Sequence, residues 1–245
     1  MDQADRQKRD PGIVLPGILT VRNLGVILNR QSILEDISFE VERGEFFTII
    51  GPNGSGKTTL FRALIGMIPY AGEVDWAPHV RIGYVPQKLD LERNVPLSLR
   101  DFLRTKSGTA EGLKRYLALV HLSADLLNRP LGALSGGEFQ RALVAFALIG
   151  DTNVLLFDEP TAGIDRPSEE QIYETLHRLQ DERGLTIITI SHDLSLVNRY
   201  ATKVLCLNKR NICFGTPEEA LQSKNLAELY GAEHFKYFHH QHHDH

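Results

Sequence analysis

The 245-residue sequence has little of several features that mark whole classes of protein. It contains only two cysteines, Cys206 and Cys213, which is too few for a disulfide framework and fits a reducing compartment. No apolar run approaches the roughly 18 residues that a membrane-spanning helix needs. The formal net charge is −4, so no overall basic field favours binding to nucleic acid. These absences favour a globular protein that neither spans a membrane nor binds nucleic acid.

The two ends of the sequence differ in composition from the part between them. The start, MDQADRQKRDPG, has no apolar segment and is not a secretory signal, so we expect residues 1–17 to be a disordered arm. Residues 18–231 are predicted to form the folded domain. Residues 232–245 are a histidine-rich tail.

Short apolar strands alternate with helical patterns along the folded region. Residues 18–50 are rich in strand patterns, and RIGYVPQ, VLLFDEP and LTIITISHD predict further strands. Helical patterns occur at GKTTLFRALIGMI and at PSEEQIYETLHRLQDERG, which ends at Gly184. This alternation predicts an α/β fold with a mostly parallel sheet that is covered on both faces. Ligands of such sheets bind beyond the carboxyl ends of the strands. The polar residues predicted at these ends are Gly51, Gln87, Asp158 and His192.

The stretch from residue 89 to residue 149 contains no convincing strand. Its helical patterns are SLRDFLRT, AEGLKRYLALVHL and SGGEFQRALVAFALIG. We interpret residues 89–145 as a helical subdomain inserted in the α/β core.

One stretch between a predicted strand and a predicted helix matches the phosphate-binding pattern G-x-x-x-x-G-K-[ST]. Glycines let the backbone curl until its N–H groups point at phosphate oxygens, and the following helix adds the positive end of its dipole. The lysine offers a charge to the β- and γ-phosphates, and the threonine offers a hydroxyl to Mg²⁺. The residues predicted to bind ATP here are Gly51, Pro52, Asn53, Gly54, Ser55, Gly56, Lys57, Thr58 and Thr59.

The strand VLLFDEP ends in two acids with different predicted tasks. Asp158 is placed to hold Mg²⁺ through water, together with Thr58. Glu159 is placed to polarise an attacking water as a general base. Strands often end in solvated acids, so this interpretation depends on the phosphate-binding stretch in the same chain.

The stretch LSGGEFQR, residues 134–141, predicts a second helix start that is suited to anions. Ser135 is a candidate N-cap, and Gly136 and Gly137 follow it. One nucleotide does not need two such helix starts in the same chain. We therefore expect two copies arranged head to tail, each offering these three residues to the γ-phosphate held by the other.

These motifs together resemble those of the ATP-binding subunits of ABC transporters. The resemblance also includes Gln87 in GYVPQ, Asp165 in TAGID and His192 in ITISHD, all in the family's order. It implies that Gln87 senses Mg²⁺ and the attacking water, and that His192 hydrogen-bonds the γ-phosphate and positions the water. It also implies that Asp165 acts across the dimer. From the residues alone, Gln87 is equally an ordinary loop amide and His192 an ordinary histidine at a strand end.

The resemblance covers residues 19 to about 220 and implies an ABC-type nucleotide-binding domain. Such a domain has a P-loop NTPase core, an antiparallel β subdomain and an inserted helical subdomain. The ligands implied are ATP and Mg²⁺, and the partners implied are a second copy of the chain, integral membrane permease subunits and an extracytoplasmic metal-binding protein. The implied location is peripheral, at the cytoplasmic face of the inner membrane.

Two positions depart from the family's pattern. An aromatic residue usually stacks on the adenine where this chain has Leu28, so we expect weaker adenine affinity or looser base selectivity. The helix after LSGGE often carries an arginine where this chain has Phe146, for which tighter packing of an apolar face is the simple explanation.

Three features indicate the cargo. RIGYVPQKLDLERNVPLSLRDFLR is similar to the corresponding region of ATPases that serve zinc and manganese importers, and VLCLNKRNICFGTPEEAL resembles that of zinc-importer ATPases. The third is the tail, because imidazole suits Zn²⁺, Ni²⁺ and Cu²⁺ far better than Mg²⁺. The tail is either a weak zinc-binding segment or a solvated terminus. Its histidines are His234, His239, His240, His242, His243 and His245.

The predicted function is therefore ATP hydrolysis that powers zinc import. A manganese or iron-complex importer is the alternative, and a soluble ATP-gated clamp or an idle binding module is more distant. The resemblance also implies a groove that receives a short helix of each permease subunit, lined by Lys88, Leu89 and VPLSLRDFL. Exposed apolar residues there would mark the partner site.

The cysteines and the remaining histidines have simpler interpretations. If LNKRN turns with Lys209–Arg210 at its tip, Cys206 pairs with Cys213 across a hairpin. The two thiols then either bind metal or are two small buried residues. The run LALVHL predicts that His121 lies on a core helix and is packed. His79 is predicted in a loop and His177 on a helix surface.

Overall fold

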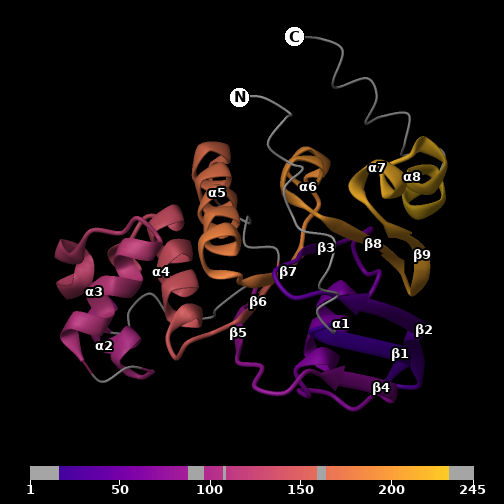
Figure 1. The fold of residues 1–245 in the computed structure, drawn as a ribbon, viewed down its shortest axis with the longest axis horizontal. Helices are drawn as coiled ribbons and strands as arrows, with labels where there is room; N and C mark the ends of the chain where they lie inside the picture. Colours follow the sequence, from indigo (N-terminus) through magenta and orange to yellow (C-terminus); the bar gives the residue numbers. More distant parts are fainter. Residues whose placement is uncertain (1–16, 88–96, 107–108, 159–163, 232–245) are drawn as a thin grey trace, which may run out of the picture.

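The computed structural model describes residues 17–87, 97–106, 109–158 and 164–231. Within these ranges the chain forms a three-stranded sheet, a six-stranded sheet and a set of helices (Figure 1). Over the same ranges, no helix combines the length and the apolar character that crossing a membrane requires.

The three-stranded sheet is antiparallel. β1 spans Leu19–Leu28, β2 spans Gln31–Val41 and β4 spans Ala71–Trp76, and their order in the sheet is β2-β1-β4. Asn29 and Arg30 join β1 to β2 and both have positive φ, as in a two-residue hairpin turn. This sheet is the antiparallel β subdomain that the resemblance implies.

The six-stranded sheet forms the core of the molecule. Its strands are β3 (Phe46–Ile50), β5 (Ile82–Val85), β6 (Val154–Asp158), β7 (Thr186–Ile190), β8 (Lys203–Asn208) and β9 (Arg210–Gly215). Their order is β5-β6-β7-β3-β8-β9, and only the edge strand β9 runs antiparallel to its neighbour. Every residue of β3, β6 and β7 is buried, because both faces of these parallel strands are covered. The predicted α/β sheet is confirmed.

Helices cover the six-stranded sheet on one face, and the antiparallel sheet with α1 covers the other. Phe46 and Phe47 are neighbours on β3 but belong to different apolar clusters, because successive strand residues point to opposite faces. Phe46 stacks on Tyr173, and Phe47 stacks on Phe39 of the antiparallel sheet. The helices on the first face are α5 (Arg166–Arg183), α6 (Leu194–Tyr200), α7 (Pro217–Ala220) and α8 (Ser223–Tyr230), and α1 (Lys57–Leu64) lies on the other.

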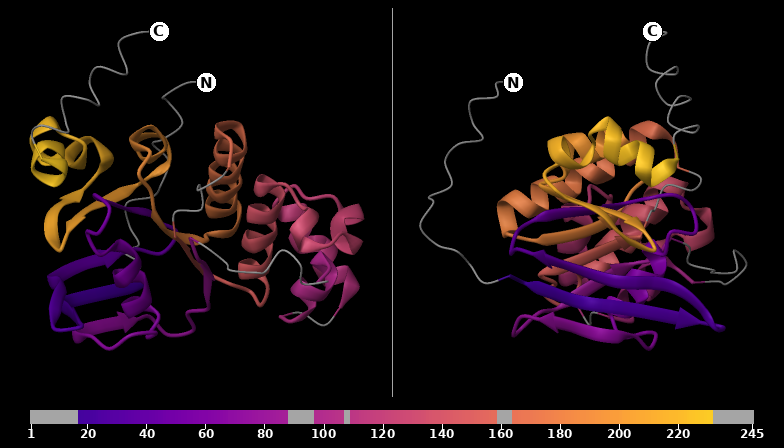
Figure 2. Two further views of the ribbon diagram at one scale, coloured as in Figure 1. Left: turned by 180° about the vertical axis from the view of Figure 1, so that it is seen from behind. Right: turned by 90° about the vertical axis from the view of Figure 1, so that its right-hand side faces the viewer.

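Three further helices form a lobe at the end of the molecule beyond β5 (Figures 1 and 2). They are α2 (Leu99–Arg104), α3 (Ala110–Leu119) and α4 (Gly136–Leu148), with short 3₁₀ turns at Ala124–Asn128 and Leu131–Ala133. Each helix lies where the sequence predicts one. The boundaries of this lobe as a subdomain stay a prediction, as do those of the arm and the tail, which lie largely outside the described residues.

The segment that the resemblance places along the permease groove buries most of its apolar side chains where the structure describes it. Leu99 and Leu103 are fully buried and Phe102 is 8% exposed, because α2 packs against α3 and α4. Lys88, Leu89 and the start of VPLSLRDFL lie outside the described residues. The lining of a permease groove by this segment stays a prediction.

The prediction for His121 is wrong. α3 ends at Leu119, and His121 is an exposed turn residue with positive φ. Val120 and Leu122 on either side are buried, so the apolar run continues across the turn while the histidine points outward. His79 lies in a loop and His177 on the exposed side of α5, as predicted.

The β8–β9 hairpin places Cys206 opposite Cys213, in the register that the sequence predicts. The turn is tighter than expected, because Lys209 alone joins the two strands and has positive φ. The cysteines are joined by a disulfide bond, which the sequence did not predict. Within the described ranges no three His, Cys, Asp or Glu side chains are grouped to hold a metal ion.

Phe146 has the simple role expected of it. Its ring stacks on Phe102 of α2 with centroids 4.4 Å apart, and the Lys106 ammonium lies 4.9 Å from its centroid. Burial in this contact lowers the pKa of Lys106. Phe146 therefore joins α4 to α2.

Replacing Phe146 with a smaller residue should weaken the packing between α2 and α4. Phe146→Ala is expected to lower the free energy of unfolding by about 2 kcal/mol, less than for a fully buried phenylalanine because the ring is only half-buried. Thermal unfolding would then shift down by roughly 4–8 °C, whereas Phe146→Leu should cost under about 1.5 kcal/mol. Equal unfolding temperatures for the alanine variant and the unchanged protein would contradict the role of this contact.

Candidate nucleotide-binding site

The loop between β3 and α1 has a backbone that two of its glycines make possible. Gly56 has φ of 100°, and a Cβ there would lie 2.5 Å from Leu34 of β2. A Cβ on Gly51 would overlap the carbonyl oxygen of Leu207 on β8. Side chains at these positions would push the loop away from the sheets that hold it.

Lys57 lies across this loop. Its ammonium donates to the carbonyl oxygens of Gly51 at 2.8 Å and Pro52 at 3.0 Å. The side chain is buried, so the positive charge is held where the loop curls. α1 begins at Lys57 without a side-chain cap on its first N–H groups. This arrangement presents positive charge and backbone donors together, which is the chemistry that binds phosphate.

Thr58 and Asp158 meet at the carboxyl edge of the six-stranded sheet. The Thr58 hydroxyl donates to Asp158 Oδ1 at 3.2 Å, although the two residues are far apart in sequence. Asp158 ends β6 and is 1% exposed. A hydroxyl and a carboxylate beside a phosphate-binding loop are the oxygen ligands that Mg²⁺ prefers.

Tyr84 is a site residue that sequence reasoning missed. It lies on β5, and its hydroxyl donates to Asp158 Oδ2 at 3.3 Å. Burial raises the pKa of Tyr84 to about 12, and the Asp158 charge adds to the shift, so the phenol keeps its proton. One carboxylate oxygen of Asp158 therefore accepts a hydrogen bond from Thr58, and the other accepts one from Tyr84. The signal was present in GYVPQ, where the tyrosine lies on the strand predicted beside VLLFDEP.

His192 follows β7 and is exposed beside the N-terminus of α6. Asp193 caps that helix through the N–H groups of Ser195 and Leu196 at 2.8 and 3.2 Å. Burial raises the pKa of Glu169 on α5, Asp193 adds to the shift and His192 opposes it. The histidine thus lies at the sheet edge that carries Asp158, near two acids.

Two further predicted site residues of the core, Gln87 and Leu28, lie in the described part of the chain. Gln87 is exposed two residues after β5, at the same edge of the sheet. Leu28 is half-buried at the end of β1, where it packs against the cluster between the two sheets. Glu159 lies outside the described residues.

Ser135 caps α4, as predicted, through a full capping box. Its hydroxyl accepts from the Glu138 N–H at 3.2 Å, and the Glu138 carboxylate accepts from the Ser135 N–H at 2.8 Å. The bond from the Ser135 N–H lowers the pKa of Glu138. Ser135 and Gly136 are exposed, while Gly137 is buried with its Cα against the Ser168 side chain.

Asp165 caps α5, accepting from the Ser168 N–H at 2.8 Å, which lowers the pKa of this carboxyl. Its partner Ser168 lies against Gly137, so the starts of α4 and α5 adjoin. Figure 1 shows this corner of the molecule at the helical lobe, apart from α1 and its loop. The structure therefore brings Thr58, Asp158 and the phosphate-binding loop together, but leaves Ser135 and Asp165 in a separate group.

The described residues fit Mg²⁺ and a nucleotide. The loop supplies a buried ammonium and an uncapped helix start, and Thr58 with Asp158 supplies oxygen ligands at its side. Within the described part of the chain the buried Ser55 hydroxyl has no hydrogen-bond partner, which leaves a polar atom in the loop for a ligand or water.

Comparisons with known proteins agree with this geometry. Residues 34–162 match the family model described as ABC transporter. The chain is 40% identical over 235 residues to the zinc import ATP-binding protein ZnuC of Pseudomonas aeruginosa strain UCBPP-PA14, a match that covers 93% of this chain and 86% of that protein.

Two solved structures have the same fold. One is cbiO1 from Clostridium perfringens, part of the ABC transporter complex cbiONQ, with a TM-score of 0.73 and 26% identity over 91% of this chain and 99% of that one. The other is a dimeric post-hydrolysis state of the ATP-binding cassette MJ0796 bound to ADP and Pi, with a TM-score of 0.69 and 23% identity over 81% of this chain and 98% of that one. From the family match and the identity to ZnuC, the chain belongs to the ABC transporter family as an ATP-binding protein.

Proposed function

We propose that this chain is the ATP-hydrolysing subunit of an ABC importer whose cargo is zinc. The observation that carries the ATPase part is the pairing of Thr58 with Asp158 at 3.2 Å beside the Lys57 loop. The zinc part is supported by 40% identity, over most of both chains, to a protein described as a zinc import ATP-binding protein.

The binding chemistry follows from the loop. The backbone donors and Lys57 hold the β- and γ-phosphates, and their positive charge offsets the phosphate charge. Thr58 and Asp158 are the residues that would hold Mg²⁺, which supplies further charge neutralisation when it is bound. Tyr84 keeps the Asp158 carboxylate in its orientation by donating to the second oxygen.

Hydrolysis needs a water that is aligned and deprotonated. We assign the general base to Glu159, which follows Asp158 at the end of β6 and lies outside the described residues. His192 is assigned to position the water at the γ-phosphate, and Gln87 to sense the metal and the water from the end of β5. Both positions lie at the carboxyl edge of the sheet, where Asp158 lies.

Two copies of the chain complete each nucleotide site in this proposal. The start of α4, with Ser135, Gly136 and Gly137, is remote from the chain's own phosphate loop (Figure 1), so it serves the loop of a second copy arranged head to tail. Asp165 adjoins this helix start and acts across the same interface. ATP closes the pair, and hydrolysis with product release reopens it.

A permease subunit is the second partner in this proposal. A groove of about 450 Å³ lies between the end of α1, β4 and β5, and is lined by apolar residues and Tyr84. Tyr70, which lines the groove, and Met67, which follows Gly66 of the lining, are 39% and 64% exposed, as expected where a partner covers apolar surface. We assign a short permease helix to this groove, which places the chain at the cytoplasmic face of the inner membrane. The groove residues are Leu64, Ile65, Gly66, Tyr70, Val74, Trp76, Ile82 and Tyr84.

Reconstitution tests the cargo. The full chain, assembled with candidate permease and metal-binding partners in liposomes, should hydrolyse ATP faster when the binding protein carries zinc than when it carries manganese. Glu159→Gln should lower turnover by about 100-fold or more, because it removes the general base, while it traps ATP and a dimer. Greater stimulation by manganese or by an iron complex would replace zinc as the cargo. An active ATPase that no membrane partner stimulates would instead favour a soluble clamp.

The role assigned to Tyr84 has its own test. Tyr84→Phe keeps the ring but removes the donor to Asp158, so the carboxylate loses its fixed orientation. We expect roughly tenfold more Mg²⁺ to be needed for half-maximal ATP binding, as for other groups that orient metal ligands. Titration of binding against Mg²⁺ at fixed ATP measures this. Tyr116→Phe is the matched control, since Tyr116 contacts Gly150 in the helical lobe. An equal Mg²⁺ requirement in both variants would remove Tyr84 from the site.

The histidine-rich tail is proposed to bind zinc and to restrain the ATPase when cytoplasmic zinc is high. Imidazole nitrogens are good zinc ligands, and several lie within a few residues of each other in the tail. Zinc should therefore inhibit ATP hydrolysis by the assembled complex at lower concentration with the full chain than after deletion of residues 234–245. Superimposable inhibition curves would show that the tail does not regulate. The tail residues assigned to zinc are His239, His240, His242, His243 and His245.

A further inference from the structure

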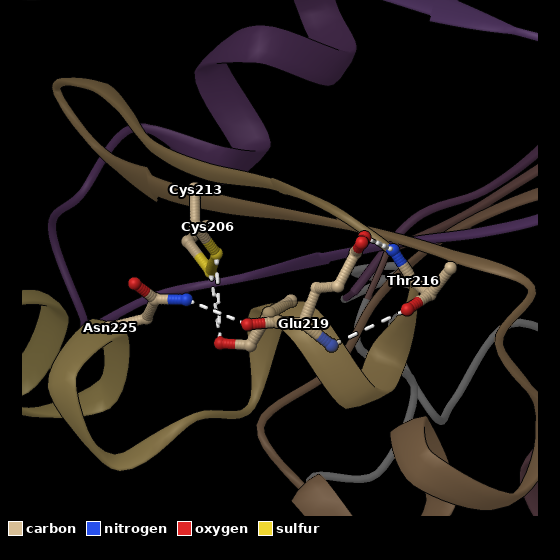
Figure 3. The surroundings of a disulfide bond; sticks show 6 residues. Cys206, Cys213, Thr216, Glu219 and Asn225 are labelled. Carbon is tan, nitrogen blue, oxygen red and sulfur yellow. Dashed lines mark hydrogen bonds between the residues drawn. A yellow bond between two sulfur atoms is a disulfide. The ribbon is translucent and has the colours of Figure 1, made fainter.

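The disulfide between Cys206 and Cys213 lies at a junction between the hairpin and two short helices. The residues face each other directly in the β8–β9 ladder, with Cα atoms 4.8 Å apart. Both sulfurs lie against the carbonyl oxygen of Ala220 on α7, at 3.9 and 3.7 Å (Figure 3). Cys206 is fully buried, whereas Cys213 is half-buried on the edge strand. Cys213 is thus the more exposed residue of the pair.

The helices over the disulfide are held firmly. Thr216 and Glu219 form a capping box at the start of α7, and the Asn225 side chain of α8 donates to the Glu219 carbonyl oxygen at 2.8 Å (Figure 3). β8 is fixed on its other side, because it pairs with β3 in the sheet. A change at the sulfurs is therefore expected to displace β9 and the hairpin tip rather than α7 or β3.

The hairpin braces the phosphate-binding loop. Cys206 is the ladder partner of Ile50, the residue that precedes Gly51. The next residue, Leu207, has its carbonyl oxygen against Gly51, where no Cβ would fit. At the hairpin tip the Lys209 N–H donates to the Ser55 carbonyl oxygen at 3.0 Å. Two of the loop's backbone contacts are therefore made by Leu207 and Lys209, within three residues of Cys206.

The tip is also fastened to the antiparallel sheet. The Lys209 carbonyl oxygen accepts from the Glu35 N–H at 2.8 Å, and the Arg210 guanidinium pairs with the Glu35 carboxylate. Leu34, beside Glu35, is the residue that a Cβ on Gly56 would meet. The hairpin thus reaches both ends of the loop, Gly51 directly and Gly56 through β2.

We propose that Cys206 and Cys213 are a redox modification site whose thiol or disulfide state sets the affinity of the loop for nucleotide. This inference rests on the proposed function, which places the pair in a reducing compartment where disulfides are more often transient or sensing than structural. The pair closes a short loop in a hairpin that its ladder already holds, so the disulfide contributes little to the free energy of unfolding.

The reagent class is a low-molecular-weight disulfide such as glutathione disulfide. The Cys213 thiolate attacks one sulfur of the reagent, which releases one thiolate and leaves a mixed disulfide on Cys213. The Cys206 thiolate then attacks the Cys213 sulfur and releases the second thiolate. Two protein thiols lose two electrons, the reagent becomes two thiols, and the two protons pass to the departing thiolates. The buried sulfur needs only to reach its neighbour.

Oxidation should strengthen nucleotide binding. The disulfide holds β9 and the hairpin tip against the loop, so less freedom is lost when phosphates bind. Reduction lets the sulfurs move apart to ordinary contact and loosens the brace. We expect the reduced chain to bind ATP about fivefold more weakly, a modest change because the ladder persists in both states.

The experiment compares the full chain in glutathione disulfide and in dithiothreitol, with the thiol count checked by alkylation and mass measurement. ATP affinity is measured by calorimetry in each state. The Cys206→Ser/Cys213→Ser variant should bind like the reduced chain in both buffers. Cys206→Ala/Cys213→Ala repeats the control with a small apolar residue, in case serine perturbs the fold.

The outcomes separate this inference from the proposed function. An affinity that changes with redox state only when both cysteines are present supports the inference. Equal ATP affinity in the two states overturns it and leaves the proposed function intact. Failure of the disulfide to form in glutathione disulfide also overturns the inference. A disulfide that persists in dithiothreitol until the chain unfolds overturns it too. A chain that binds ATP in neither state overturns the proposed function as well.

Discussion

The hydrogen bond between Thr58 and Asp158 is the contact on which the rest of the structure's chemistry depends. It joins Thr58, in the helix that follows β3, to Asp158, the last residue of β6, and β7 separates these two strands in the sheet. All three strands run parallel, so their carboxyl ends reach the same edge and the two side chains meet there. Without this sheet order the phosphate-binding loop would have its positive charge but no oxygen ligands for a metal beside it.

The same loop is constrained from its other side by β8. Leu207 leaves no room for a side chain at Gly51, and Lys209 hydrogen-bonds Ser55. The loop therefore lies between a carboxylate on the β6 side and a backbone brace on the β8 side. The glycines give a shape that would cost conformational entropy if it formed only on binding, and the flanking strands restrict it before a ligand arrives. Binding in this family member is thus as much a property of the sheet as of the loop.

The sequence was sufficient where local rules decide the outcome. The glycine pattern predicted the loop, and short apolar runs that end in polar residues predicted the parallel sheet. The expected turn at LNKRN predicted the pairing of Cys206 with Cys213. The sequence was insufficient where the outcome depends on residues that are distant in sequence or on where an element ends. Tyr84 reaches Asp158 because β5 pairs with β6 so that Tyr84 faces Leu156, a register that no single strand reveals. His121 shares its apolar surroundings with true core positions, and only the end of α3 at Leu119 separates the two cases. The roles of Glu159, His192 and Gln87 stay predictions, since they depend on a nucleotide and a second copy.

The two helix starts proposed to bind one nucleotide differ in a way that suits two chains. α1 begins without a side-chain cap, so its first N–H groups are directed to the loop, whereas α4 is closed by the Ser135–Glu138 capping box. A closed start cannot curl around a ligand, but it can present Ser135 and Gly136 rigidly to one. That rigidity extends to α5, because Gly137 packs on Ser168 and Arg141 donates to Gln171. The α4 and α5 starts, with Asp165, are therefore joined in one surface. In the proposed dimer, a triphosphate held in the loop of one copy would meet this whole surface of the other, so closure would depend on the γ-phosphate rather than on the base.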